Sequence, residues 1–412
     1  MKRLGVAWLF CLLLSSGLAA QPIGFELFDF VARVLQDDYI NPRGLNVDNV
    51  VEKYRTELLK KCPSLTDCPY SNAQPVVKAM LKSFDDAHLV YSDYASSDSD
   101  TELGDPVTTG RYGFWVHPTS MVLAVSDVYA RSPADSAGIR VGDVVVSVND
   151  QPASPIVLGK KLRELELSFV ETTIKLRRGD QLYTVRMRPT YSNILYPVLD
   201  DLGNSVFRIK MYEFGINLHD RLVHDLIRTA NTRGAKALIL DLRYNEGGSG
   251  LTSLKIAAAF ISQPSEVSIE KDGSRYRFQY NDGVIQWQDL NDATNKGVFE
   301  GQLRNPASFA GAVIVLTTAK TFSAAEHVAA LLQSAKRAVV IGEATAGALD
   351  TGADYKQFKD LGTMYYGSSR YQNLKGEWLP SRVTPDVKIA DFASGQDDVL
   401  REAIKRLTTS KP

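Results

Sequence analysis

The sequence lacks excess charge of either sign and, after residue 14, any apolar run long enough to cross a bilayer. Its 47 Lys and Arg residues against 48 Asp and Glu give a formal net charge of −1. This balance gives no indication of a nucleic-acid or anionic-membrane partner. The apolar content of 44% and charged content of 23% are typical of a globular protein, and 412 residues are enough for two or three domains.

Cysteine is scarce, with three residues in the chain. Cys11 lies within the apolar N-terminal run, whereas Cys62 and Cys68 enclose five residues. No histidine or third cysteine lies near this pair, which argues against a zinc site, and we expect neither a metal nor another cofactor. In an exported chain the spacing predicts a small disulfide loop.

Residues 1–20 have the pattern of a secretory signal peptide. Lys2 and Arg3 precede an apolar run over residues 4–14, and the small residues Ser-Ser-Gly-Leu-Ala-Ala follow at 15–20. We therefore expect a periplasmic or secreted protein with no membrane span after cleavage. Retention of the segment as an anchor is the alternative.

The remaining chain divides into three regions. Helical apolar periodicity extends to about residue 95, short β-rich runs follow a polar boundary at 96–100, and strands alternate with helices after residue 203. The expected fold class is mixed α/β and multidomain, and its core contains a largely parallel sheet. The predicted units are the signal peptide 1–20, a helical region 21–100, a β-module 101–192 and an α/β core 193–412.

The β-module resembles a PDZ domain. The run SPADSAGIRVGDVVVSVNDQPAS over residues 132–154 carries the resemblance, and YGFWV at 112–116 stands where that family has its carboxylate-binding loop. In PDZ domains a peptide C-terminus binds this loop and adds a strand to the sheet edge. The resemblance places the edge at Gly113, Phe114, Trp115 and Val116. A β-module that only positions other parts is the alternative.

Ser323 lies at a junction that suits a nucleophile. An apolar strand is predicted over 312–316, and a helix begins at Ser323. The free N–H groups at a helix N-terminus could stabilise an oxyanion next to the hydroxyl. The simpler interpretation is a capping box, in which Ser323 caps the helix and Glu326 reaches back.

A serine nucleophile needs a base, and the chain has five histidines. We expect His219 and His224 on the surface of an amphipathic helix, His117 within the β-module, and His327 packed or solvated along the Ser323 helix. His88 follows the helical region, where a capping role is the ordinary expectation. No Gly-x-Ser-x-Gly elbow is present, which argues against an α/β-hydrolase.

Four ordered motifs resemble the C-terminal processing (tail-specific) serine peptidases, a group that also includes tricorn-core and retinoid-binding-protein-like members. They are DLRYNEGG at 241–248, TFSAAE at 321–326, VIGEATAG at 340–347 and VTPDV at 383–387. The order of helical region, PDZ domain and α/β core matches as well. The resemblance covers most of the chain after the signal peptide.

The resemblance implies roles for particular residues. Ser323 corresponds to the nucleophile, and the Ala324 amide with a glycine of Gly247-Gly248 corresponds to the oxyanion hole. The base of the processing peptidases is a lysine 25 residues after the serine, but that position is Ala348 here. The matched residues Asp241, Arg243, Asn245, Glu326 and Glu343 are expected to be structural.

The tricorn-like branch also lacks the lysine and uses a histidine from the N-terminal side, in a short motif that Asp86-Ala87-His88 resembles. We therefore expect His88 to be the base, with Asp86, Glu343 or Glu377 as its orienting acid. The expected function is an exported serine endopeptidase acting on proteins or peptides, whose PDZ domain recruits or gates substrate C-termini. The alternative is an inactive binder of peptides or apolar ligands on the same fold.

Overall fold

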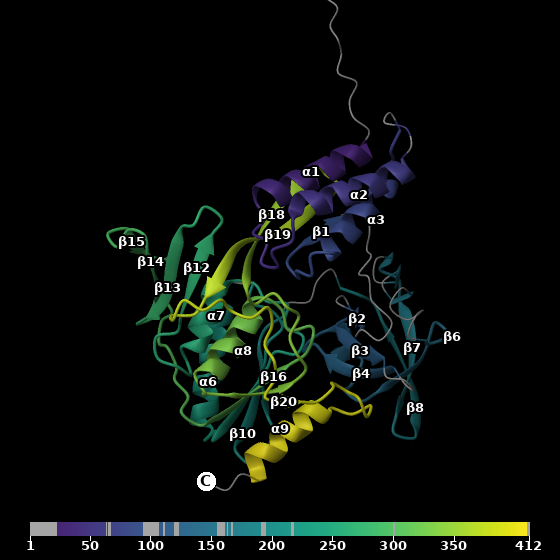
Figure 1. The fold of residues 1–412 in the computed structure, drawn as a ribbon. Coiled ribbons are helices and arrows are strands. Elements are labelled where there is room, and N and C mark those ends of the chain that lie inside the picture. Colours follow the sequence, from purple (N-terminus) through teal and green to yellow (C-terminus); the bar gives the residue numbers. More distant parts are fainter. Residues whose placement is uncertain are drawn as a thin grey trace, which may run out of the picture.

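The computed structural model describes residues 23–62, 64, 67–93, 107–109, 112–118, 123–154, 161–162, 164–165, 168–190, 195–215, 218–299 and 301–409. The predicted signal peptide lies outside these ranges. The described residues form a helical cap, a β-module and an α/β core, with the helix α9 of Asp398–Thr409 against the core (Figure 1). No described helix is long and apolar enough to cross a membrane.

The cap forms because three amphipathic helices bury one shared apolar face. Phe28, Leu58 and Met80, one from each helix, are all fully buried in this cluster. The Asn46 side chain caps the second helix by accepting from the Asn49 amide. The cap helices are α1 Ile23–Asp37, α2 Val47–Lys61 and α3 Tyr70–Lys82.

The β-module is an antiparallel sheet in the strand order β2-β3-β4-β5-β7-β8, with β6 paired to β5. Alternating burial along its strands produces a separate apolar core around Tyr112, Phe114 and Leu176. The described part of the module is rich in strands, as its short β-rich runs predicted. The elements are β2 Val107–Thr109, β3 Phe114–Pro118, β4 Leu123–Val128, α4 Pro133–Ser136, β5 Val144–Val148, β6 Gln151–Pro152, β7 Thr172–Arg178 and β8 Gln181–Met187.

The core contains the predicted, largely parallel sheet. Its order is β20-β17-β16-β11-β10-β9, and only the β9–β10 pair is antiparallel. The bounds are β9 Val198–Asp201, β10 Val206–Lys210, α6 His219–Thr232, β11 Ala237–Asp241, α7 Gly250–Ala257, β16 Ala312–Thr317, α8 Ala324–Ser334, β17 Val339–Gly342 and β20 Val387–Lys388.

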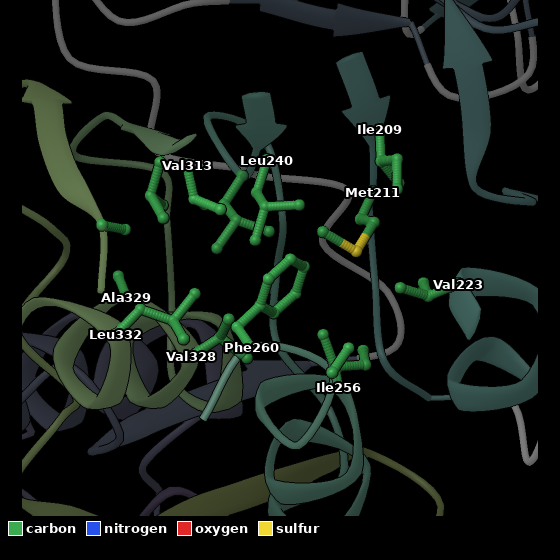
Figure 2. Packing of buried hydrophobic residues seen from close by; sticks show 14 of the residues in the cluster. Ile209, Met211, Val223, Leu240, Ile256, Phe260, Val313, Val328, Ala329 and Leu332 are labelled. Atoms are coloured by element: carbon green, nitrogen blue, oxygen red, sulfur yellow. The ribbon is translucent and has the colours of Figure 1, made fainter. Parts of the chain in front are cut away.

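Apolar side chains from both layers fill the space between this sheet and its helices. Figure 2 shows Leu240 and Val313 pointing from the strands toward Val328 and Leu332 of α8. Burial of a Leu or Val side chain contributes about 1.5–3 kcal/mol each, so this interface fixes α8 firmly on the sheet. Because β11 and β16 are parallel neighbours, the segments after their carboxyl ends emerge at the same edge.

A second, antiparallel sheet was not predicted. It has the order β1-β19-β12-β13-β14-β15, and β18 pairs with the opposite side of β19. Through β1, which follows α3, the sheet joins the cap to the core (Figure 1). Its strands are β1 Val90–Asp93, β12 Ser265–Glu270, β13 Arg275–Asn281, β14 Val284–Asp289, β15 Lys296–Val298, β18 Thr351–Phe358 and β19 Gly362–Gln372.

Candidate active site

Ser323 stands at the N-terminus of α8 in a strained backbone conformation. Its φ of 52° and ψ of −121° lie where non-glycine residues are rare. Its N–H donates to Glu326 Oε2 at 2.8 Å, as in the expected capping box. Its hydroxyl lies 3.0 Å from His88 Nε2. The turn therefore directs the hydroxyl to an imidazole.

His88 lies in the loop between α3 and β1, on the cap side of the site. Its Nδ1 is 2.8 Å from Thr351 Oγ1, so both ring nitrogens are engaged. The Phe322 ring packs edge-on against the imidazole, with centroids 5.0 Å apart. Burial, and then the charge of His327, lower the pKa of His88 to about 4. The imidazole is therefore neutral near pH 7 and able to accept a proton.

The partner of His88 is a threonine, and none of the three predicted carboxylates contacts the ring. Asp86 accepts from the His88 backbone N–H at 2.9 Å and lies 3.0 Å from the Tyr39 hydroxyl. Glu343 accepts from the Asp391 amide, and Glu377 pairs with Asn373 at the surface. The structure thus differs from the expectation of an orienting acid on the imidazole. Asp86 positions the backbone of His88 rather than its side chain.

An arginine of the cap joins the two segments that carry His88 and Thr351. Arg43 Nη1 is 2.7 Å from Asp350 Oδ2, and Arg43 Nε donates to the Asp85 carbonyl at 3.1 Å. The Asp350 side chain is only 4% exposed, so it depends on this cation for charge compensation. Arg43 therefore holds the His88 loop against the first residue of β18.

The glycine turn after β11 lies directly against Ser323. A Cβ built on Gly247 would be 2.9 Å from Ser323 Cβ and 3.1 Å from the Ala324 nitrogen, and φ at Gly247 is +81°. The Gly247 amide donates to Asn245 Oδ1 at 2.9 Å. Among the described residues, the amides of Gly248 and Ala324 donate to no other protein group. These two amides are the donors available to an oxyanion.

Buried polar contacts fix the turn in place. Asn245 Nδ2 donates to the Met211 carbonyl at 3.1 Å, and the Phe322 amide donates to the Asn245 carbonyl at 2.9 Å. Arg243 pairs with Asp241 at 2.8 Å and with Asp391 at 2.9 Å. Burial alone would raise the pKa of Asp241, but the cations Arg243, Arg208 and Lys210 hold it well below its usual range.

Glu326 links Ser323 to the loop that contains Ala348. Its buried carboxylate accepts from the amides of Gly347 at 3.1 Å and Ala348 at 2.9 Å, as well as from Ser323. Burial raises the pKa of Glu326, while these hydrogen bonds and that of Thr345 oppose the shift. Ala348 is fully buried. The side chain at position 348 is therefore a methyl group enclosed by the scaffold.

The expectations for other histidines were partly wrong. His219 and His224 are buried rather than exposed, and the His224 ring contacts the Lys255 carbonyl and the Ala307 amide. His327 is buried on α8, with Nδ1 2.8 Å from Glu266 Oε2. Burial alone would lower the pKa of His327, but the Glu266 carboxylate and its hydrogen bond raise it above the ordinary value.

The predicted peptide-binding edge of the β-module is covered. β3 pairs with β4 on one side and with β2 on the other, so Phe114, Trp115 and Val116 have no free strand edge. Trp115 also stacks on Tyr244 of the core, with centroids 4.8 Å apart, and Phe114 and Val116 are buried. Trp115 therefore contacts Tyr244, three residues before the glycine turn, rather than solvent.

The two remaining cysteines form the predicted disulfide, which closes the short loop between α2 and α3. The Gly24 amide donates to the Cys68 carbonyl, so the loop is tied to the first cap helix. Within the described ranges, no cluster of three His, Cys, Asp or Glu side chains could hold a metal ion.

With this geometry in place, comparisons with known proteins are informative. Residues 206–389 match the model of Peptidase family S41, and residues 124–160 match the PDZ domain model. The PDZ domain model thus matches before the S41 peptidase model along the chain. The PDZ match covers the run that suggested this fold in the sequence.

Curated relatives carry the same core. The carboxy-terminal processing protease CtpA of Bacillus subtilis is 25% identical over 331 residues, which cover 77% of this chain and 64% of that protein. The carboxyl-terminal-processing protease of Picosynechococcus is 29% identical over 239 residues, covering 56% and 52%. The chain thus spans between half and two-thirds of the length of these relatives.

Solved structures have the same fold. A putative S41 protease from Bacteroides fragilis aligns with a TM-score of 0.59 at 15% identity, covering 93% of this chain and 98% of that one. Mature CPAF aligns with a TM-score of 0.54 at 14% identity, covering 93% and 96%. At such low identity these similarities establish the fold alone.

Proposed function

We propose that this chain is an exported serine endopeptidase in which His88, rather than a lysine, activates Ser323. The observation that carries the proposal is the 3.0 Å separation between His88 Nε2 and Ser323 Oγ, which brings together residues 235 positions apart. A neutral, buried imidazole at hydrogen-bond distance from a strained serine has the geometry that a general base requires.

The two contacts of the imidazole support a proton path through His88. With its hydrogen on Nδ1, the ring donates to Thr351 Oγ1, and Nε2 accepts the Ser323 proton. Ser323 Oγ then attacks the peptide carbonyl, and the imidazolium returns the proton to the leaving amine. Water, deprotonated by the same nitrogen, hydrolyses the acyl-enzyme and restores the serine.

The oxyanion of each tetrahedral intermediate is expected to bind the amides of Gly248 and Ala324. Both N–H groups are preorganised by the glycine turn and the helix N-terminus, so they need little reorganisation during the reaction. Engagement of Gly247 N–H by Asn245 favours Gly248 over Gly247 as the second donor. The N-terminal end of α8 adds a favourable dipole.

Ala348, which stands where the processing peptidases have their lysine, agrees with a lysine-lacking, tricorn-like enzyme. Its backbone remains bound to Glu326, so the loop keeps its position although the amine is absent. His88, on the cap side of the site, then serves as the base in place of the lysine amine. Activity would then depend on the docking of cap and core, since His88 and Ser323 belong to different parts.

The substrates we infer are proteins or peptides, and the PDZ domain recruits or gates their C-terminal tails. Gating is the better supported role, because Trp115 stacks on Tyr244 three residues before Gly247. Strand addition to β3 would require β2 to leave its edge. The Cys62–Cys68 disulfide fits an oxidising compartment outside the cytoplasm, which agrees with the signal-peptide pattern.

The test is hydrolysis of an unstructured protein by the purified chain. We expect cleavage that a fluorophosphonate abolishes and that is absent from Ser323→Ala. Mass spectrometry should find the probe on Ser323. Full cleavage by the Ser323→Ala variant would refute the assignment, and so would labelling at another serine.

A further inference from the structure

A cavity of about 810 Å³ lies beside the catalytic histidine, between α3 and β1. Ala87 and Leu89, the neighbours of His88, line it, and Ala346, Gly347 and Arg382 line it from the core. Since Gly347 is bound to Glu326 and Glu326 to Ser323, the cavity reaches the catalytic scaffold. Its volume is in the range of small-ligand and peptide sites.

The walls of this cavity suit an extended chain. β1 ends its sheet, because it pairs with β19 on one side and with no other described strand. α3 forms the facing wall through Gln74, Lys78 and Lys82. A groove between a helix and a strand edge that no described strand covers can accept a peptide as an added strand, with backbone hydrogen bonds supplying affinity. Because β1 starts two residues after His88, such a peptide would lie next to the catalytic residues.

Arg382 gives the cavity a chemical preference. Its guanidinium lies over Gly347, where a built Cβ would be 3.0 Å from Nη2. Among the described residues, no side chain pairs with it by hydrogen bond or ion pair. Its backbone is fixed, since the Val383 amide donates to Thr345 Oγ1 and the Leu349 amide to the Ser381 carbonyl. The arginine is thus anchored, exposed and uncompensated.

Most acidic groups around the cavity are already engaged. Asp86 is buried on Tyr39 and the His88 amide, and Asp93 is buried on Gln74. Asp85 is the exposed carboxylate of the lining, whereas Lys78 and Arg382 are available cations. A planar guanidinium binds carboxylates through two parallel hydrogen bonds, which a lysine cannot match.

We propose that Arg382 binds a carboxylate of a peptide lying along β1, and so selects substrates with a free C-terminus or an acidic side chain at that position. The inference deepens the proposed peptidase function and depends on it only for catalysis. It assigns carboxylate selection to the cap cavity, separately from the PDZ edge that β2 covers.

Binding can be measured independently of catalysis with the full-length Ser323→Ala chain. The probes are three fluorescein-labelled, valine- and alanine-rich decapeptides: one ends in a free carboxylate, the second is its amide, and the third is an amide with glutamate as its last residue. We expect the free-acid or glutamate peptide to bind about tenfold more tightly than the plain amide, because a charged hydrogen bond is lost without the carboxylate. Whichever charged peptide binds tightly identifies the source of the carboxylate.

In the Ser323→Ala chain, a further Arg382→Gln substitution should reduce the affinity ratio between the charged peptide and the plain amide to about one. Arg382→Lys in its place should keep part of the ratio. Arg221→Gln, at an exposed arginine of α6, is the matched control and should keep the full preference. Equal affinities for all three peptides, no binding by any of them, or a preference that survives Arg382→Gln would overturn the proposal.

Hydrolysis of the same peptides by the chain with Ser323 intact separates the two hypotheses. Carboxylate-dependent binding without hydrolysis would retain the Arg382 site and refute the peptidase function. Hydrolysis that is indifferent to the terminal carboxylate would retain the peptidase and refute the site.

Discussion

Two buried histidines lie near Ser323 in regions of opposite character. At the seam between cap and core, His88 contacts two hydroxyl groups, those of Ser323 and Thr351. On the buried face of α8, His327 contacts the Glu266 carboxylate. Its ring packs edge-on against Tyr371, with the ring centroids 4.7 Å apart. Burial lowers the pKa of His88 to about 4, whereas Glu266 raises the pKa of His327.

The difference indicates how the surroundings of two nearby histidines can favour the neutral form of His88 and the protonated form of His327. A hydroxyl partner orients an imidazole without favouring its charged form, while a carboxylate favours the imidazolium. A protonated His327 further lowers the pKa of His88. His88 is therefore suited to accept a proton, and His327 to hold α8 against β12.

The largest effect is expected from the reacting pair. Ser323→Ala and His88→Ala should each lower kcat by roughly a thousandfold or more, because nucleophile and base act as a unit. The double variant should be little slower than either single one. Ser334→Ala, at the exposed end of α8, should match the unaltered chain in the same peptide assay. Additive losses would mean that the two residues do not act together.

Thr351→Val removes the partner of His88 Nδ1 while preserving shape. The imidazole loses its orientation and a buried N–H loses its acceptor, so kcat should fall about tenfold to a hundredfold with little change in KM. Steady-state kinetics would measure this split. Thr384→Val, at an exposed position, provides the control, and unchanged kcat in Thr351→Val would remove Thr351 from the account.

Arg43→Gln should act mainly on stability and on the placement of His88. It leaves the buried Asp350 without its cation, which should cost about 2–3 kcal/mol of unfolding free energy. Arg55→Gln is the control from the same cap, because the side chains of its ion pair with Asp29 are more exposed, at 36% and 26%, and the pair should be worth about 1 kcal/mol. Urea unfolding curves give both values. Equal losses would contradict the special role of Arg43.

Glu266→Gln changes the electrostatic surroundings of His88 from a distance. Without the carboxylate, His327 loses the group that favours its charge, so the pKa of His88 should rise toward its ordinary value. The acid limb of the kcat/KM profile should shift to higher pH, with only a small change at neutral pH. A profile that stays in place would show that His327 carries no charge that His88 senses.

Much of the core could be predicted from sequence because its strands and helices have distinct periods and glycine-marked junctions. Ser323 and His88 were expected from motif resemblance, and their contact could be tested only in three dimensions. Thr351 lies 263 residues from His88 and opens an edge strand, with no local signal of its role. The antiparallel sheet was missed because its strands, such as Arg275–Asn281, are polar and only partly buried.

The covered PDZ edge illustrates a second limit. The sequence YGFWV resembles a peptide-binding loop, and its backbone does form the expected strand β3. Whether that strand has a free edge depends on β2, a three-residue strand too short to predict. The stacking of Trp115 on Tyr244 likewise depends on how two modules dock, which local patterns do not encode.

The central claim, that a neutral His88 activates Ser323, is tested most directly by the pH dependence of fluorophosphonate labelling at Ser323. Because the folded pKa of about 4 lies below the ordinary 6.5, His88 stabilises the fold less as pH falls from 6.5 to 4, so the folded fraction must be followed in parallel. The account predicts that labelling of folded protein stays constant from neutral pH down to about 5, declines with a midpoint near 4, and is abolished by His88→Ala. Rapid labelling of His88→Ala, or a midpoint at or above neutral pH, would contradict it.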